Sequence, residues 1–487
     1  MKKSFYVNLA FLLVVNLLVK PFWIFGIDVA VQNAVQAESY GSYFSLLKIS
    51  LLFQALLDFG IGNFNNRSVA QDAYFMRRHL SDIFFLKLLL SLVYIGITLF
   101  CAVFLQAGNY PLLAMLAGNQ ILLSFLLYLR TNISGMQFFK TDSLLSVTDK
   151  LLMILICGWL LLTMRDTFRI EWFIYAQSAS LLFTIIMALI IVGKIHVLPP
   201  LRWSTSGMME IGRKTFPYAM LGLMMSIYFH VDGVMLKSLL PDGNQQAGIY
   251  AASWRLLDAA NNMTGFLFAT LLLPLFARII SEGKNVHELA SSSFKGIMLI
   301  AVFASITCFF YRNEIIHLLY HHQDARWADI LGILMPSFIG FSTVYIYGTL
   351  LTANGSMKAL NIIALGGMGL NIALNFIFIP RYEAMGAAMA TLITQSFVAL
   401  AHIYATMRII PFEVNVKQAL WFLFFCAGIF LIFLGTKQIS ESWILNLIVG
   451  SLLSAVCALL MKIVDVSKVR NLLQVREELA ASSRPPV

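Results

Sequence analysis

Long apolar runs constrain this chain more than any other feature of its sequence. The sequence contains about fourteen such runs. Most are close to 20 residues, the length that crosses a bilayer. The runs cover residues 5–27, 41–62, 81–105, 110–130, 150–164, 171–193, 215–240, 247–278, 293–311, 328–352, 359–379, 385–407, 418–436 and 443–463. Because lipid offers the backbone no hydrogen-bond partner, each run must be helical. The sequence therefore predicts an all-α, polytopic membrane protein with about 14 transmembrane helices.

The composition supports this class and argues against several others. Hydrophobic residues make up 59% of the chain and charged residues 12%, whereas soluble domains carry about 25% charged residues. The net charge is +10, but no basic tract with interleaved aromatic residues suggests a nucleic-acid surface. No Walker A motif is present, so we do not expect ATP hydrolysis by the chain itself. The five cysteines lie in apolar runs and are interpreted as packing residues.

Lysine and arginine residues are distributed unequally between the two sides of the membrane. With the N-terminus in the cytoplasm, most of the 34 fall on the cytoplasmic side, a count that includes Lys87 and Lys150. The other side holds Arg165, Arg169, Lys237, Arg312, Arg326, Arg381 and Lys437. This asymmetry predicts that both termini are cytoplasmic. Three cations, Lys20, Lys48 and Arg255, belong to neither side.

An internal repeat relates two of these three cations. The stretches "YGSYFSLLK" (40–48) and "AGIYAASWR" (247–255) both contain Gly-x-Tyr-x-x-x-x-[Lys/Arg], with an offset of 207 residues. Lys48 and Arg255 therefore occupy equivalent places in the second and eighth runs. Repeats of this kind build transporters in which the substrate site lies between the repeats.

A cation inside a membrane span costs at least about 2.5–3.5 kcal/mol and is tolerated where it faces water or a counter-charge. One interpretation is structural: Lys48 extends toward the interface, and Arg255 pairs with Asp258, which lies three residues on. The functional interpretation is that Lys48 and Arg255 line a cationic central cavity that binds an anion. Lys20, next to Pro21, joins them as a third candidate, although it could also extend to the interface.

Two acids are candidates for ion coupling. Asp232 in "YFHVDGVML" and Asp258 could each counter a cation or carry a coupling proton. We expect no cofactor beyond a proton or sodium gradient. A separate histidine-rich segment, "HLLYHHQD" (317–324), has His317 and His321 four residues apart, a spacing that can bind zinc. A solvated loop is favoured there, so no metal site is predicted.

The segment "GSMKALNIIALGGMGLNIALNFIFIPRYEAMGAAMATLITQ" (355–395) contains the pattern N-[IL]-x-L-N-x-x-x-I-P followed by G-A-A-x-A-T. It resembles the C-terminal half of Wzx-type polysaccharide and O-antigen flippases. These belong to the superfamily of multidrug, oligosaccharidyl-lipid and polysaccharide exporters. Residues 31–71 and 248–259 resemble the same family.

The resemblance implies two six-helix lobes around a central cavity, with residues 1–200 and 201–410 forming the lobes and 411–487 two further helices and a tail. It implies a non-enzymatic flippase that moves an undecaprenyl-diphosphate-linked oligosaccharide across a bacterial inner membrane by alternating access. Lys48 and Arg255 would bind the diphosphate. Expected partners are the lipid-linked oligosaccharide, membrane lipids and possible polymerase and glycosyltransferase proteins, with no nucleic acid.

Two alternatives remain open from the sequence. The first is a drug/cation antiporter of the same fold, but the first run has no equivalent of the cation-site aspartate found in multidrug exporters of this superfamily. The second is a membrane glycan polymerase or ligase. Such an enzyme would need catalytic groups in a large outer loop, and the predicted outer loops are short.

Overall fold

The chain forms an all-α bundle in the computed structural model, which describes residues 16, 18–62, 65, 75–136, 138–195, 203–321, 323–410 and 416–461. Within these ranges no β-strand occurs. Nine of the described helices are long and apolar enough to cross a membrane. The fold class predicted from the sequence, an all-α polytopic membrane protein, is therefore confirmed.

The helices fall into three groups along the chain. The first comprises the π-helix η1 (Phe22–Asp28), α2 (Val29–Leu52), α3 (Gln54–Asp58), α5 (Phe75–Phe104), α6 (Tyr110–Gly135), α7 (Phe139–Thr163), the short 3-10 helix η2 (Arg165–Thr167) and α8 (Ile170–Ile195). The second comprises α9 (Thr205–Leu239), α10 (Gly243–Ser281), α11 (His287–Phe310), α12 (Arg312–Leu319), α13 (Ala325–Leu334), α14 (Ser337–Ala353) and α15 (Met357–Ile409). The third is the pair α16 (Val416–Thr436) and α17 (Trp443–Leu460).

Two of these helices contain a sharp turn, so each provides two membrane segments. α2 turns at Gln36 (φ 64°, ψ 170°) and α15 turns at Glu383 (φ 53°, ψ −133°). Straight, the 53 residues of α15 would extend about 80 Å, far beyond the hydrocarbon core of about 30 Å. Divided at these turns, the described helices follow the apolar runs of the sequence in order, and the short η2 and α12 lie between runs.

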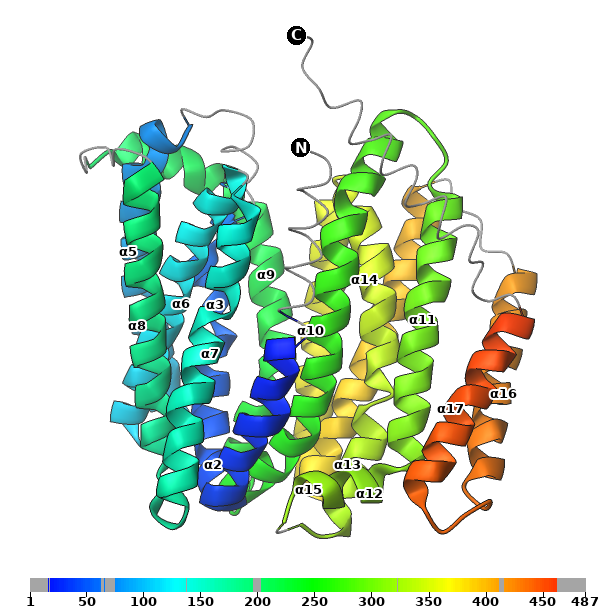
Figure 1. Cartoon of the computed structure of the whole chain (residues 1–487). Coiled ribbons are helices and arrows are strands. Elements are labelled where there is room, and N and C mark those ends of the chain that lie inside the picture. The colour runs from blue at the N-terminus through cyan, green and yellow to red at the C-terminus, as the bar shows by residue number, and fades with distance from the viewer. Residues whose placement is uncertain are drawn as a thin grey trace.

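The two halves of the chain form separate helix groups that meet at α2, α9 and α10. Figure 1 shows α5, α6, α7 and α8 together on one side and α11, α13, α14 and α15 on the other, with α16 and α17 beside α11 at the edge. α2 packs extensively against α10 and α9, and α9 packs against α15. The domain limits at residues 200 and 410 stay a prediction.

Two details differ from the sequence interpretation. The fifth segment is not short, because α7 begins at Phe139, and its polar first turns include Lys150. Lys87, counted among the cytoplasmic cations although it falls in the predicted run 81–105, lies inside α5 and is 1% exposed. Its ammonium group donates to the carbonyl of Leu57 (2.8 Å) and to the hydroxyl of Ser124 (2.7 Å). A cation near the end of α3 is favourable because carbonyl groups accumulate there, and charge counting cannot detect this.

Candidate functional site

The two halves of the chain come into very close contact at Gly41 and Gly248, the glycine pair of the repeat. A methyl group added to Gly41 would lie 2.9 Å from the carbonyl carbon of Asn244, and one added to Gly248 would lie 2.7 Å from that of Ala37. Ordinary contacts are 3.4–4 Å. Ala37 and Asn244 are themselves 207 residues apart, so the contact is reciprocal, as expected of equivalent repeats. We call it the glycine seam.

Several polar contacts accompany the glycine seam. The side-chain amide of Gln32 donates to the carbonyl of Gly248 (2.9 Å). That of Asn33 donates to the carbonyl of Leu319 (2.8 Å). Both donors lie in α2 before its turn, and both acceptors lie in the second half of the chain. The seam therefore closes the interface between the halves at the end of the bundle where α2 and α15 turn (Figure 1).

Lys48 lies two helical turns beyond Gly41 and is 3% exposed. Its Nζ lies 3.1 Å from Nδ1 of His230 in α9 and 4.1 Å from the ring centroid of Trp254 in α10. Because an ammonium group can only donate, this contact requires a neutral His230 whose Nδ1 accepts. Lys48 thus crosses from the first half of the chain to the second. Cation–π contact with Trp254 favours the ammonium group there.

Arg255 crosses the interface in the opposite direction. Its Nε donates to a carboxylate oxygen of Asp28 (2.8 Å), and its Nη1 donates to the hydroxyl of Tyr320 (2.7 Å). The guanidinium carbon lies 4.8 Å from the ring centroid of Tyr40, whose hydroxyl donates to the other oxygen of Asp28 (2.9 Å). The Nη2 group is buried and has no hydrogen-bond partner among the described residues. The pairing of Arg255 with Asp258 considered from the sequence is therefore wrong.

Asp258 is exposed although it lies within α10. The residues that precede it, from Gln246 to Arg255, are buried. Asp258 hydrogen-bonds to Asn262, which is also exposed, and interacts electrostatically with Lys48 and Asp28. These interactions place its carboxylate on the side of α10 that faces the first half of the chain. Since a charged group avoids lipid, this position indicates water-accessible space between the halves beyond the glycine seam.

Asp232 lies in a buried polar cluster inside the second half of the chain. Its carboxylate accepts hydrogen bonds from Asn375 (2.7 Å) and Tyr250 (2.9 Å), and also from the hydroxyl of Thr391. Asn371 contributes a side-chain oxygen next to Asn375 (3.1 Å). The side-chain oxygen of Asn375 is buried without a partner. The cluster therefore combines one carboxylate with several neutral oxygen atoms.

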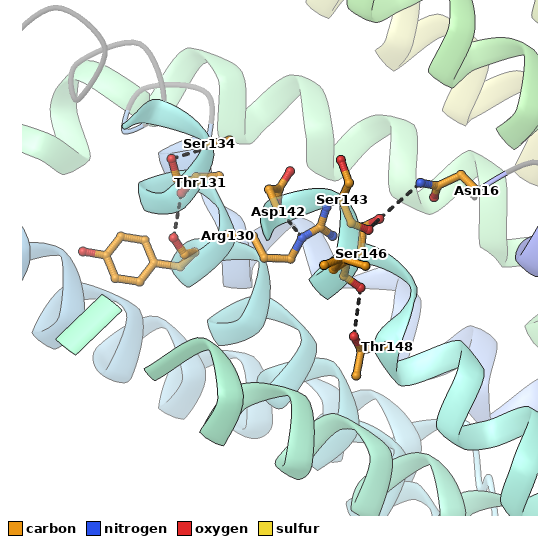
Figure 2. A network of polar contacts seen from close by, with 10 residues as sticks. Asn16, Arg130, Thr131, Ser134, Asp142, Ser143, Ser146 and Thr148 are labelled. Carbon is orange, nitrogen blue, oxygen red and sulfur yellow. Dashed lines mark hydrogen bonds and ion pairs between the residues drawn. The ribbon is translucent and has the colours of Figure 1, made fainter. Parts of the chain in front are cut away.

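Lys20 belongs to a different group of charges. It interacts electrostatically with Arg130, Lys150 and Asp149. Lys150 pairs with Asp149 (3.2 Å), and Arg130 in α6 pairs with Asp142 in α7 (2.7 Å). Figure 2 shows Arg130 and Asp142 pointing toward each other. Beside them Asn16 of the first segment donates to Ser146 (3.2 Å). The structure thus brings Lys48 and Arg255 to the interface and places Lys20 about two turns from Asp28 along the first segment.

A family model described as "Polysaccharide biosynthesis protein" matches residues 6–280, which is more than half of the chain. The chain belongs to this family. The match includes the glycine seam, Lys48, Arg255 and two of the three stretches from which the resemblance was drawn. The family recognised from the sequence is therefore confirmed.

Solved structures show which fold this polysaccharide biosynthesis protein has. The lipid II flippase MurJ in an inward closed conformation aligns with 91% of the chain and 98% of its own length, with a TM-score of 0.65 and 15% identity. An inward-facing multidrug resistance transporter of the MATE family aligns with 79% of the chain and 94% of its own length, with a TM-score of 0.62 and 16% identity. At these identities the comparison establishes the shared fold.

A curated relative is more similar in sequence over a shorter range. An uncharacterized membrane protein of Methanocaldococcus jannaschii is 27% identical over 202 residues, which are 41% of this chain and 46% of that protein. The match spans less than half of the relative's length.

Sequence reasoning about this family member missed the partners rather than the cations. Asp28 lies directly after the predicted run 5–27 and so outside the predicted first span, but it is the last residue of η1, within the first segment. Tyr40 and Tyr320 carry no signal in the sequence that links them to Arg255. Pro21 did carry a signal, because a residue without an N–H interrupts helical hydrogen bonding, and the π-helix η1 begins directly after it.

Proposed function

We propose that this protein moves an undecaprenyl-diphosphate-linked oligosaccharide from the cytoplasmic to the outer leaflet of a bacterial inner membrane. One observation carries the proposal beyond the family: each half of the chain sends a buried cation, Lys48 or Arg255, across the interface to the other half. The shared fold supports alternating access, in which the two halves rock around a site between them.

The contacts of the two cations suggest how a diphosphate binds. Among the ion pairs of the described residues none involves Lys48, which contacts a neutral imidazole and aromatic rings. Arg255 has one carboxylate partner and an unused Nη2 donor. In a low-dielectric site, both groups attract phosphate strongly. Rocking that opens the glycine seam would separate Arg255 from Asp28 and release the guanidinium for the second phosphate oxygen.

Lys20 is proposed to contact the substrate at an earlier stage. Its neighbours Arg130 and Lys150 place three cations and two carboxylates close together, so the group has one positive charge in excess. Lys20 precedes Asp28 by about two helical turns in the first segment, so this group of charges lies away from the glycine seam. A phosphate that enters from the cytoplasmic side would meet Lys20 before it reaches Lys48.

We further propose that Asp232 or Asp258 couples transport to a proton or sodium gradient. The Asp232 cluster supplies carboxylate, amide and hydroxyl oxygens, which suit a hard cation, and a buried carboxylate can also carry a proton. Asp258 is exposed and within electrostatic reach of Lys48. To distinguish the two ions, transport is measured in vesicles that contain either the wild-type protein or Asp232→Asn. A sodium gradient is applied in one experiment and a proton gradient in the other.

The proposed setting is a bacterial inner membrane with both termini in the cytoplasm. Membrane lipids surround the bundle, and glycosyltransferases and a polysaccharide polymerase would supply and consume the lipid-linked oligosaccharide. O-antigen or another lipopolysaccharide component is the glycan class we propose.

The test is translocation by purified protein in liposomes. A fluorescent polyprenyl-diphosphate-linked sugar is added, and the fraction accessible to an external quencher is followed over time. Lys48→Gln and Arg255→Gln should each slow exchange at least about tenfold, the loss of about 1.4 kcal/mol in transition-state binding. Lys214→Gln is the matched control, because Lys214 is an exposed lysine paired only with Glu210.

The result that would overturn the proposal is normal exchange by both interface variants. A drug/cation antiporter is the second candidate, favoured by the exposed carboxylate of Asp258. It predicts uptake of cationic dyes that Asp258→Asn abolishes, with no movement of the lipid-linked sugar. A polymerase or ligase is not proposed, because the solved structures that share the fold are a flippase and a transporter.

A further inference from the structure

A pocket lies between α12 and the beginning of α17, away from the interface between the halves. Its volume is about 400 Å³, and it is lined by Asn313, Glu314, His317, Leu318 and Trp443. The first four residues come from α12, the helix that lies between membrane segments, and Trp443 is the first residue of α17. The function proposed above uses none of these residues.

Glu314 is the residue that indicates a ligand. Its Oε2 atom is buried and has no hydrogen-bond partner within the part of the chain that the structure describes. Glu314 also takes part in none of the ion pairs found among the described residues. A carboxylate oxygen removed from water without a partner is costly. A cationic ligand in the pocket would offset that cost.

The charges around the pocket favour a cation over an anion, although the chain as a whole carries +10. Of the basic residues on neighbouring elements, Arg312 is paired with Asp329 (3.2 Å), and Lys437 donates to the neutral carbonyl of Phe310 (2.9 Å). Glu441, two residues before Trp443, adds a further exposed carboxylate. A cation is therefore favoured next to Glu314, which carries the negative charge among the residues that line the pocket.

Trp443 provides an aromatic wall that suits an ammonium group. Cations are attracted to the face of an indole ring, and tryptophan is typical of the membrane–water interface. Figure 1 shows α12 and the beginning of α17 at the end of the bundle where α2 and α15 turn. Along α17, Ile444, Ile448 and Leu452 are exposed apolar residues, so acyl chains can lie against the helix directly below the pocket.

We infer that this pocket binds the ammonium headgroup of phosphatidylethanolamine. The primary ammonium donates hydrogen bonds to Glu314 and to the side chains of Asn313 and His317, and it lies near the ring of Trp443. The acyl chains follow α17. A primary ammonium is preferred to a quaternary one because only the former donates hydrogen bonds. The lipid then links α17 to the second half of the chain.

The test is direct binding of dioctanoyl phosphatidylethanolamine to the purified full-length protein in detergent. Titration calorimetry or native mass spectrometry measures the binding. The phosphatidylglycerol and phosphatidylcholine analogues serve as comparison lipids. Glu314→Gln keeps the shape and removes the charge, and it should weaken phosphatidylethanolamine binding about two- to fivefold. Trp443→Leu should weaken it about two- to fivefold. Glu171→Gln, in the first turn of α8, is the matched control and should bind as the wild type does.

Three results would overturn the inference. They are equal binding of the phosphatidylethanolamine and phosphatidylglycerol analogues, unchanged binding by Glu314→Gln, and zinc binding that excludes the lipid. If Trp443→Leu does not fold, Glu314→Gln alone tests the inference, because Gln has nearly the same side-chain volume as Glu. Sugar translocation by Glu314→Gln is measured separately, so that failure of this inference and failure of the proposed transport function are distinguishable.

Discussion

Gly248→Ala tests whether the glycine seam holds the two halves of the chain together. The added methyl group would lie 2.7 Å from the carbonyl carbon of Ala37, against 3.4–4 Å for an ordinary contact. Backbone atoms cannot rotate away as a side chain does, so α2 and α10 must separate by at least about 0.7 Å. Overpacking of this kind costs about 1–3 kcal/mol. Because only the state with a closed seam bears that cost, the equilibrium should shift about 5- to 150-fold away from it.

The assay is the distance between two spin labels at the closed end of the interface. Glu38 and Gln245 are both exposed, lie near the seam and are 207 residues apart, so cysteines at these positions report the separation of the halves. The five native cysteines are replaced first. We expect the wild type to show mainly a short distance, and Gly248→Ala a larger population at long distance. Gly41→Ala should act in the same direction, because its contact is the reciprocal one.

Gly193→Ala is the control for helix propensity. Gly193 also lies in a membrane helix, but a methyl group there meets nothing within 4 Å. If Gly248→Ala and Gly193→Ala give the same distance distribution as the wild type, the seam does not determine the conformational equilibrium, and the steric reasoning is wrong. Retained elution volume in size-exclusion chromatography shows that each variant is folded.

Two further predictions concern buried charges. Asp28→Asn leaves the guanidinium of Arg255 without its carboxylate, which should lower the free energy of unfolding by up to about 3–5 kcal/mol. Thermal melting measures the loss. Adding Arg255→Gln to Asp28→Asn should restore part of the stability. Equal melting temperatures of Asp28→Asn and the wild type would contradict the ion pair. Lys87→Met should change stability by less than about 1 kcal/mol, because Ser124 still donates to the same carbonyl, that of Leu57 (2.9 Å). Adding Ser124→Ala removes the second donor and should cost about 1–3 kcal/mol more in the free energy of unfolding. A double-mutant cycle in denaturant measures this cost. If the effects of the two substitutions simply add, the two side chains do not share the Leu57 carbonyl.

The sequence alone determined that this protein lies in a membrane and that its membrane segments are helices. Runs of about 20 apolar residues require a bilayer, and a bilayer requires helices. The repeat also paired Lys48 with Arg255, because equivalent positions in two repeats are visible in the sequence without coordinates. The close contact at Gly41 and Gly248 appeared only in the structure.

Only the tertiary structure decided which charges belong together. Asp28 and Arg255 are 227 residues apart, and Lys48 and His230 are 182 residues apart. Lys87, which charge counting assigned to the cytoplasmic side, is buried inside a helix. An ion pair depends on the positions of two side chains in space, and no pattern of neighbours along the chain encodes that distance. Hydrophobicity and backbone geometry act locally and can be read from the sequence, whereas the partner of a buried charge is fixed by the packing of distant helices.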